Sequence, residues 1–272
     1  MTLRPARLWL YVPLLLMTVF YLLPLYVVAV TSLKSFDQVS LQTMWQLPNG
    51  INLDNFVAAW EVLEPNLWNS VKLVVPAAVL SAILGSLNGF VLAKWKFPGA
   101  DFVFPALLFG MFIPYQAVLI PLVEFMRDIN LYGGIPGLVL THVIYGIPIT
   151  TLTFRNYYAG IPGELIEAAR IDGAGMFRVY WNVLLPLSIP AFVVVLIWQF
   201  AAVWNDFLFA VVLTHPAGGP ITVALNNMAG SQIVQWNVQM AGAFLAALPT
   251  LIVYILLGRY FLRGMLAGAL KG

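Results

Sequence analysis

The residues best placed for chemistry in this chain lie in one short polar stretch, "GELIEAARIDGAG" at 163–175, between long apolar runs. Glu164 and Glu167 fall near the start of an expected helix, where the positive end of the helix dipole favours acidic side chains. Gly173 supplies the stop, because glycine accepts the left-handed conformation that ends many helices. The pattern predicts a helix of about ten residues, too short to be stable alone in water. The expected helix must therefore pack against another surface.

The side chains of this expected helix suit contact with a partner. Ala168 and Ala169 lack bulk, so another surface can approach the backbone closely. Glu167 and Arg170 are three residues apart, which lets them pair on one helix face, and they also offer charges to a partner. The stretch therefore predicts recognition of another protein outside the membrane.

Residue types that support other chemistry are scarce. The chain has no cysteine and only two histidines, His142 and His215, which excludes thiolate metal sites and argues against a histidine-based metal cluster. No lysine follows a glycine, so the Gly-x4-Gly-Lys-Ser/Thr loop that cradles nucleotide phosphates is absent. We therefore expect no enzymatic activity, no cofactor and no metal in this chain.

The elements around the polar stretch are predicted to cross a membrane. Of the 272 residues, 61% are hydrophobic and 9% charged, and the mean hydropathy is +0.90, against about 25% charged residues in a soluble domain. A spanning helix needs about 20 apolar residues. The sequence predicts an all-α polytopic membrane protein with six spans, at about 9–31, 69–93, 102–125, 135–154, 188–211 and 241–262.

The distribution of basic residues predicts the orientation of these spans. An even number of spans puts both ends of the chain on one side, and cytoplasmic segments carry an excess of lysine and arginine. The opposite side has only three of them, Lys34, Lys72 and Arg127. We therefore expect both termini in the cytoplasm, with the remaining basic residues: Arg4, Arg7, Lys94, Lys96, Arg155, Arg170, Arg178, Arg259, Arg263 and Lys271.

The segments between the spans divide the chain. An outer loop is expected at about 32–68 and a cytoplasmic insertion, which holds the polar stretch, at about 155–187. We predict an N-terminal tip, first span and outer loop at 1–68, a membrane domain at 69–262 and a cytoplasmic tail at 263–272. No soluble segment is long enough to have a core of its own.

Asp206 is the only acidic residue buried inside a predicted span, and acids in such positions are functional candidates. It follows Leu187 by 19 residues, which at 1.5 Å per residue places it about 28 Å along the helix, near the outer boundary of the hydrocarbon core. Two interpretations stay open: an acid solvated at the interface, or a group at the outer mouth of a transport pathway.

The third and fourth predicted spans contain prolines and polar side chains. Pro105, Pro114, Pro121 and Pro148 can break these helices, and broken helices with inward polar groups commonly line transport cavities. Hydrogen bonding between packed helices is the alternative use of such residues. The candidate pathway residues are Tyr115, Gln116, Thr141, His142, Asn205 and Asp206.

Several stretches resemble a known family. In the polar stretch and after it, the residues that carry the resemblance are Glu167, Ala168, Ala169, Gly173, Val183, Leu185 and Pro186. Their spacing resembles the EAA loop in the inner-membrane permeases of binding-protein-dependent ABC importers, where isoleucine usually stands in place of Val183. The carbohydrate-uptake branch, which includes the maltose importer, is also similar in "NSVKLVVPAAVLSAILGSLNGFVLAKWKFPG", "IPYQAVLIPL", "VWNDFLFAVVL" and the tail "LRGMLAGALKG". The resemblance covers about residues 10–272.

The resemblance implies a type I importer permease fold in which the short helix is a coupling helix that docks on a cytoplasmic ATPase. It implies docking roles for Glu164, Glu167, Ala168, Ala169, Asp172, Gly173 and Pro186. The tail residues Gly268, Lys271 and Gly272 would contact the ATPase dimer, although a frayed end is the alternative. The implied partners are a homologous permease, two ATPase subunits that bind ATP and Mg²⁺, an extracytoplasmic sugar-binding protein and the sugar.

The resemblance leaves the cargo open. A sugar, with a weak similarity to glucose or mannose importers, is the preferred cargo because the spans hold essentially no paired cations for a phosphate. The alternative is another small solute, such as glycerol phosphate, an oligopeptide or an amino acid. A membrane-embedded enzyme would need clusters of catalytic side chains that this sequence does not offer.

Overall fold

A computed structural model describes residues 8–215, 217–230 and 234–269, with the backbone alone described at 8, 10 and 259–269. The regular elements of these residues are helical, apart from one isolated bridge between Gly133 and Thr214. The α-helices are α1 (Leu8–Ser32), α2 (Asp54–Lys94), α3 (Ala100–Phe109), α4 (Tyr115–Asp128), α5 (Ile135–Ala159), α6 (Gly163–Ile171), α7 (Met176–Val179), α8 (Leu185–Leu187), α9 (Ile189–Trp204), α10 (Leu208–Leu213), α11 (Ile221–Ala229) and α12 (Trp236–Ala269). The all-α class is confirmed.

The predicted spans correspond to helices, with corrections at their ends. Among the described residues, four helices are long and apolar enough to cross a membrane, α1, α2, α5 and α12, and the number rises to six if two bent pairs each count as one span. Helix α2 begins at Asp54, so the outer loop predicted at 32–68 is about 20 residues and not 37. The fifth predicted span, 188–211, is interrupted, because α9 ends at Trp204 and α10 is separate.

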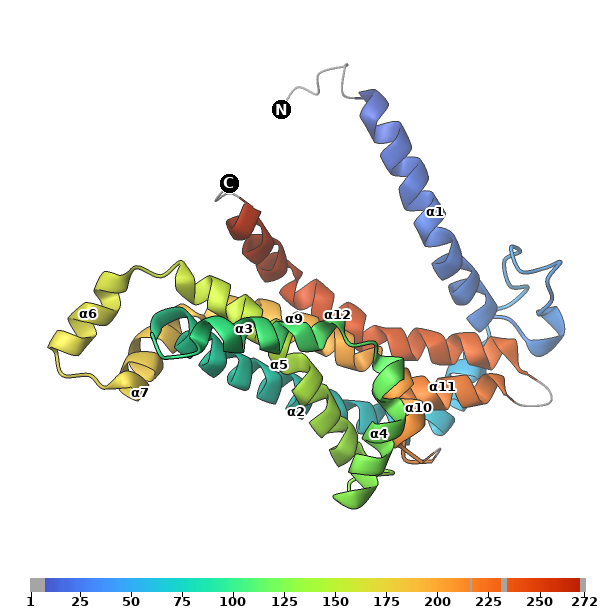
Figure 1. The fold of residues 1–272 in the computed structure, drawn as a ribbon. Coiled ribbons are helices and arrows are strands. Elements are labelled where there is room, and N and C mark those ends of the chain that lie inside the picture. The colour runs from blue at the N-terminus through green and yellow to red at the C-terminus, as the bar shows by residue number, and fades with distance from the viewer. Residues whose placement is uncertain (1–7, 216, 231–233, 270–272) are drawn as a thin grey trace. The chain divides into compact units, whose positions relative to one another are not determined.

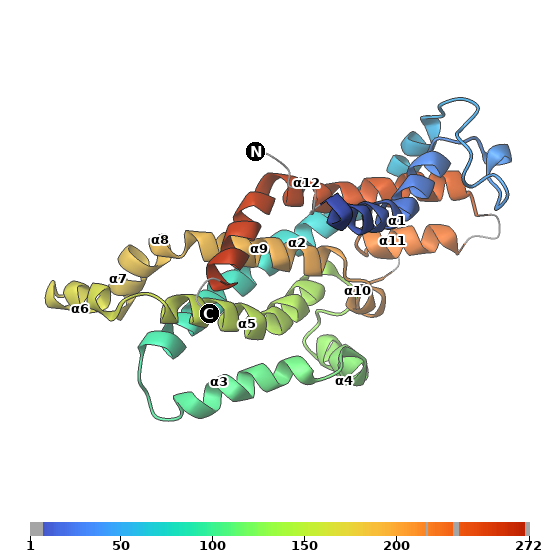
Figure 2. The same cartoon turned by 90° about the horizontal axis from the view of Figure 1, so that it is seen from above.

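The third predicted span is broken at its middle. Helices α3 and α4 meet at 99°, with a single 3₁₀ turn, η3 (Gly110–Phe112), at the corner that Figure 2 shows. Pro114 explains the break, because it removes an N–H and drives the preceding residue out of the helical conformation. Ile113 is accordingly extended. The two other prolines of this span, which were also predicted to break it, lie inside helices: Pro105 in α3 and Pro121 in α4.

The chain forms two units, residues 1–65 with 224–248, and residues 66–223 with 249–272. In the first, the rings of Phe56 and Phe244 lie edge to face at 6.0 Å. The buried amide of Asn237 donates to the side-chain oxygen of Asn55 at 2.8 Å. Asn55 in turn donates to the backbone oxygens of Ser32 and Lys34 at 2.8 and 2.7 Å. A buried polar chain therefore fixes the end of α1 to the start of α2.

The loop after α1 holds a buried cation. Lys34 is 2% exposed and its ammonium group donates to the backbone oxygen of Thr43 at 2.6 Å. Burial lowers the pKa of this ammonium group, because the apolar surroundings disfavour its charged form. The bond to Thr43 compensates part of that cost and folds the loop over Lys34.

The second unit depends on a close approach of α2 to α5. Gly85 and Gly89 form a Gly-x3-Gly pattern on α2, and small residues at this spacing let membrane helices approach closely. A Cβ at Gly85 would overlap Thr150, and a Cβ at Gly89 would lie 2.7 Å from the backbone nitrogen of Arg155. The Thr150 hydroxyl uses this proximity to donate to the backbone oxygen of Ser81 at 2.9 Å.

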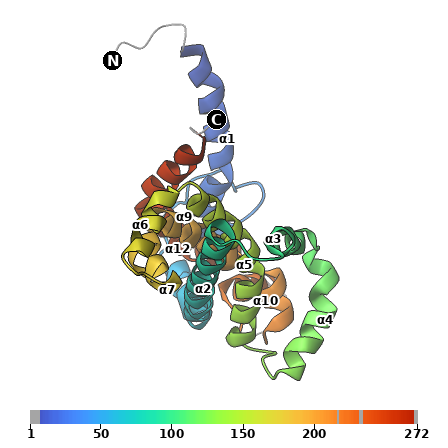
Figure 3. The ribbon, with the colours of Figure 1, turned by 60° about the vertical axis from the view of Figure 1, so that its left-hand side comes forward.

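Helices α6 and α7 lie at one end of the second unit, and α4 and α10 lie toward the other (Figure 1). Figure 3 shows α10 between α4 and α5, and it contacts both. Backbone bonds tie the end of α10 to the α4–α5 loop: Gly133 N–H donates to Leu213 O at 2.9 Å, and His215 N–H donates to Gly133 O at 3.2 Å. At the α6 end, a hydrophobic core gathers around Phe90, Phe154 and Tyr158.

We predict that Gly89→Ala lowers the free energy of unfolding by about 1–3 kcal/mol, because the added methyl group overpacks the seam with α5. Thermal unfolding of the purified chain in detergent would measure this. Gly258→Ala is the matched control, since a Cβ there meets nothing within 4 Å and alanine favours a helix. An equal loss of stability in both variants would contradict a close-packed seam.

Candidate functional site

The predicted docking helix is α6, Gly163–Ile171, and its end has the expected geometry. Gly173 has φ +78°, the left-handed conformation. Its N–H donates to Arg170 O at 3.0 Å, and Ala174 N–H donates to Ala169 O at 2.9 Å. This pair of bonds is the Schellman motif. Because an L side chain is strained at this φ, glycine is required at 173.

Helix α6 packs against the second unit through apolar side chains on one of its faces. Ile166 is buried in the core cluster, and Ala169 packs against it half-buried. The outward face carries apolar groups that the rest of this chain does not cover: Ile171 is 87% exposed and, on α7, Phe177 is 79% exposed. Both side chains are therefore available for contact with another protein or with lipid.

The end of α2 holds the helix in place. The Lys94 ammonium group donates to the backbone oxygen of Ile161 at 2.6 Å. The guanidinium carbon of Arg170 lies 5.3 Å from the centroid of the Trp95 ring, a cation–π contact. Arg170 therefore anchors α6 on Trp95, the residue that directly follows α2, a contact that the predicted pairing with Glu167 did not anticipate.

The structure brings most of the predicted docking residues onto one short arm. Ala169 is half-buried, whereas the other five are exposed: Glu164, Glu167, Ala168, Asp172 and Gly173. Pro186 is not part of this arm, because it lies in α8 where the chain returns to α9. Of the predicted tail residues, Gly268 lies in α12, and Lys271 and Gly272 lie outside the described residues.

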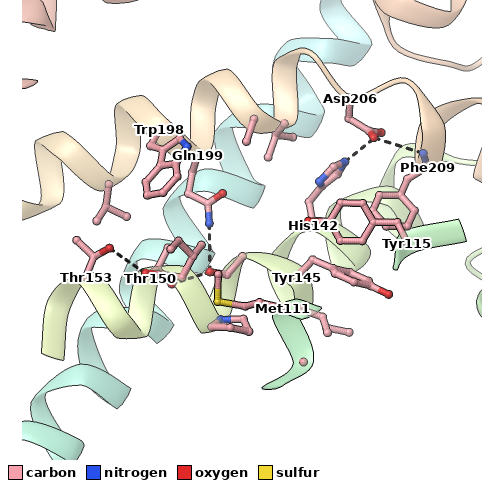
Figure 4. A pocket seen from close by; sticks show the side chains of 18 of the residues that line it. Met111, Tyr115, His142, Tyr145, Thr150, Thr153, Trp198, Gln199, Asp206 and Phe209 are labelled. Atoms are coloured by element: carbon pink, nitrogen blue, oxygen red, sulfur yellow. Dashed lines mark hydrogen bonds and ion pairs between the residues drawn. The ribbon is translucent and has the colours of Figure 1, made fainter. Parts of the chain in front are cut away.

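A cavity of about 550 Å³ opens in the second unit (Figure 4). Side chains of α5 and α9 line most of it, and the η3 corner, the start of α4 and the start of α10 complete it. The polar and aromatic lining residues are Tyr115, His142, Tyr145, Thr150, Thr153, Trp198, Gln199, Asp206 and Phe209.

Asp206 has a defined place at one end of the cavity. Its carboxylate accepts bonds from the N–H groups of Phe209 and Ala210 at 3.3 and 3.0 Å, which caps the first turn of α10. The Oδ2 atom that accepts from Ala210 also lies 3.3 Å from Nε2 of His142, which makes an ion pair when the imidazole is protonated, and these two side chains are 12% and 10% exposed. Asp206 is therefore not a freely solvated acid at the interface, one of the two sequence-based interpretations.

Aromatic rings surround this pair. The rings of Tyr115, Tyr145 and Phe209 lie 5.1–5.2 Å apart in all three pairings. The His142 ring meets Phe209 edge to face at 5.8 Å. The cavity thus has an apolar aromatic wall beside one carboxylate and one imidazole.

The opposite end of the cavity is a junction of three helices. The Gln199 amide of α9 donates to the backbone oxygen of Gly146 on α5 at 3.2 Å. A Cβ at Gly146 would overlap this amide and the Ser81 hydroxyl of α2. Glycine is needed here because α2, α5 and α9 meet without room for a side chain.

Of the predicted pathway residues, Tyr115, His142 and Asp206 line the cavity together. The other three lie outside its lining: Gln116 is exposed, Thr141 bonds to Gly137 O within its own helix, and Asn205 bonds to Ala201 O. The sequence-based prediction missed Tyr145, Trp198 and Gln199. Gln199 could have been recognised from the sequence, because an amide side chain in the middle of an apolar span is unusual and indicates a buried polar contact.

Comparison with known proteins agrees with this architecture. Residues 82–266 match the family described as the binding-protein-dependent transport system inner membrane component. A probable ABC transporter permease of Pyrococcus horikoshii is 47% identical over 270 residues, 98% of each chain. The chain belongs to the permeases of binding-protein-dependent ABC transporters. The resemblance seen in the EAA stretch is confirmed.

Two further similarities refine this assignment. A xylose/arabinose import permease of Haloferax volcanii is 34% identical to this permease, with 90% of this chain and 87% of the relative covered. The crystal structure of a bacterial ABC transporter involved in the import of the acidic polysaccharide alginate has a chain of the same fold, with a TM-score of 0.81, 24% identity and coverage of 96% of this chain and 99% of that chain. The importer permease fold is therefore confirmed.

Family membership defines the general role of the chain. It is the permease component of an ABC transporter, embedded in the inner membrane by several spans, and it is not a catalytic subunit. It works in a complex with a periplasmic binding protein and ATPases.

We predict that Asp206→Ala lowers the free energy of unfolding by about 1 kcal/mol, because the cap of α10 is lost. Asp206→Asn should cost only a few tenths of that, since asparagine caps helices as well as aspartate does. Thermal unfolding in detergent would measure both. Asn205→Ala is the control, because the Asn205 amide donates to Ala201 O at the end of α9 and is not part of the cap of α10. The capping role is wrong if Asp206→Ala is as stable as this control.

Proposed function

We propose that this permease imports a neutral sugar and that the cavity forms its part of the translocation pathway. The observation that carries the proposal is the lining: aromatic rings, a carboxamide and hydroxyl groups stand around one carboxylate, which accepts from two backbone N–H groups and lies 3.3 Å from His142. Aromatic faces and neutral hydrogen-bonding groups suit the CH and OH groups of a sugar. The sugar named for the xylose/arabinose relative supports the same class of cargo.

Other cargoes fit the lining less well. A phosphate ester such as glycerol phosphate calls for arginine or lysine, and neither occurs among the described residues that line the cavity. An amino acid or a peptide terminus also carries charges that need partners, whereas the acid in the described lining, Asp206, already accepts from the N–H groups of Phe209 and Ala210. The cavity therefore favours an uncharged molecule.

The second part of the proposal concerns energy. Helix α6 docks on a cytoplasmic ATPase subunit, and the exposed Ile171 and Phe177 supply apolar contact at the rim of that interface. Two ATPase subunits bind ATP and Mg²⁺, and this chain binds no cofactor. Both termini lie in the cytoplasm, on the side of α6.

The pathway is completed by a homologous permease that pairs with this chain. Substrate arrives from the sugar-binding protein when the spans are open outward. Closure of the ATPase subunits on ATP moves the docked helices, and hydrolysis lets the spans open inward. The chain acts by alternating access, and its own side chains bind the sugar only transiently.

We predict that Glu167→Ala and Gly173→Pro weaken coupling to the ATPase. The first removes an exposed charge from α6, and the second removes the Gly173 N–H that bonds to Arg170 O. Co-purification of the ATPase with the chain, together with sugar-stimulated ATP hydrolysis in liposomes, would measure the loss. Glu124→Ala is the matched control, because this acid is exposed on α4. Wild-type coupling in both variants would disprove docking through α6.

We predict that Tyr145→Ala lowers sugar transport by about tenfold, because a ring of the aromatic wall is lost. The measurement is uptake by the full complex in liposomes, with glucose, mannose, xylose and arabinose tested separately. Tyr21→Ala is the control, since Tyr21 is 72% exposed on α1 and does not line the cavity. Uptake of glycerol phosphate, an amino acid or a peptide, and of none of the sugars, would overturn the assignment of cargo.

A further inference from the structure

Four buried hydroxyl groups form a chain of hydrogen bonds between the α6 arm and the cavity helices. They belong to Ser86, Tyr158, Tyr180 and Ser188, each 4% exposed or less. Ser86 Oγ lies 2.6 Å from the Tyr158 hydroxyl and 2.9 Å from the Tyr180 hydroxyl. Tyr158 also lies 3.1 Å from Ser188 Oγ, which bonds to Leu185 O at 2.9 Å. We name these four residues the hydroxyl chain.

The direction of each hydrogen bond follows from Ser188, the last member of the hydroxyl chain. Ser188 O–H donates to the Leu185 carbonyl, which can only accept, so Ser188 accepts from Tyr158. The single hydroxyl proton of Tyr158 is used in its bond to Ser188, so Ser86 must donate to Tyr158. Tyr180 then donates to Ser86. Every proton is used once in a single order, and hydrogen bonds aligned in this way strengthen one another.

The hydroxyl chain connects the elements that would have to move together during transport. Tyr180 opens the π-helical turn η4 (Tyr180–Leu184), which continues directly from α7. Ser86 lies on α2 and Tyr158 on α5. Ser188 is the break at which Met176–Leu187 and Ile189–Trp204 meet at 75°.

A neighbouring tyrosine strengthens the same bend. The Tyr157 hydroxyl donates to the backbone oxygen of Leu187 at 2.6 Å. Pro190 has no N–H to offer the carbonyl four residues before it, so the helix alone does not hold this corner. Two adjacent tyrosines of α5 therefore fix the bend from outside, and π-helical turns such as η4 are frequent at functional positions.

We propose that the hydroxyl chain is a positioning device that makes α5 and α9, the two main cavity helices, follow the motion of the α6–α7 arm. The inference rests on the proposed docking of α6 on the ATPase. When the hydroxyl chain is intact, a displacement of the α6–α7 arm reaches the bend at Ser188 and turns α9. When the hydroxyl chain is broken, the arm still docks and the ATPase still hydrolyses ATP, but α5 and α9 no longer follow the displacement of the arm.

The test compares Tyr158→Phe, Ser188→Ala and the double variant in the complete transporter in liposomes. Sugar molecules imported per ATP hydrolysed should fall about fivefold in Tyr158→Phe, within the range of residues that carry coupling between sites. Tyr180→Phe should have a smaller effect, because it removes only the first bond. The double variant should be no worse than Tyr158→Phe, since residues that share a bond are not additive.

Two further measurements separate positioning from simple loss of stability. The ATPase must co-purify with each variant as it does with wild type. Because the chain has no native cysteine, spin labels can be placed at Gly163 on α6, where an added Cβ meets nothing within 4 Å, and at Leu80 on α2, which is 45% exposed. The distribution of distances between the labels should be narrow in wild type and broad in Tyr158→Phe. Tyr26→Phe is the matched control, because it also removes one hydroxyl bond, to Trp45 O at 2.8 Å.

The outcomes are distinct. A wild-type ratio of sugar to ATP in Tyr158→Phe, or an equal fall in Tyr26→Phe, would overturn the positioning role. If the ATPase fails to bind wild type through α6, the proposed docking fails instead, and the spin-label distances still report whether the hydroxyl chain holds the arm. If no sugar is imported by wild type, the cargo is wrong, and the ATPase and label measurements remain valid.

Discussion

The contact of α2 with α5 is the constraint on which the second unit depends. In the hydrocarbon core of a membrane no water is present to satisfy a polar group, so each hydroxyl needs a partner within the protein. Gly85 and Gly89 bring the two backbones close enough for this. Thr150 then reaches the Ser81 carbonyl, and Ser86 reaches Tyr158. A wider separation would break both of these bonds between the helices, although Thr150 would keep its bond to Gly146 O within α5.

The seam also explains why the cavity and the docking arm belong to one mechanical system. Helix α5 lines the cavity with His142, Tyr145 and Thr150 and carries Tyr158 at its other end. Helix α9 shows the same division, with Gln199 toward the cavity and Ser188 as the residue before its first turn. Each helix thus presents polar groups at two levels, one for the solute and one for the arm.

The sequence predicted local features well and tertiary features poorly. The position of α6 and its Schellman end follow from the spacing of acids, alanines and Gly173, which act within a few residues of each other. The corner at Pro114 was foreseeable, whereas Pro148 lies inside α5 without breaking it, because neighbouring helices decide whether a proline ends a helix. Arg170 was expected to pair within α6, and its contact with Trp95 depends on a residue 75 positions away.

The same limit applies to the candidate site. Asp206 was recognisable as an acid in an apolar span, but its role as the cap of α10 depends on a break in the fifth span that hydropathy does not reveal. Tyr145 and Trp198 look like ordinary apolar filling in the sequence. Only the packing of α5 against α9 shows that they face a cavity.

The apolar rim of the docking arm has a consequence for the life of the subunit in the cell. Ile171 and Phe177 are exposed in the isolated chain, and on the proposed topology they face the cytoplasm. A copy synthesised in excess of its ATPase would present this surface to proteases and chaperones, and partners that bind only the folded state stabilise it by mass action. The amount of permease in the membrane would then adjust itself to the supply of ATPase, so that subunit stoichiometry is set by degradation of unassembled copies.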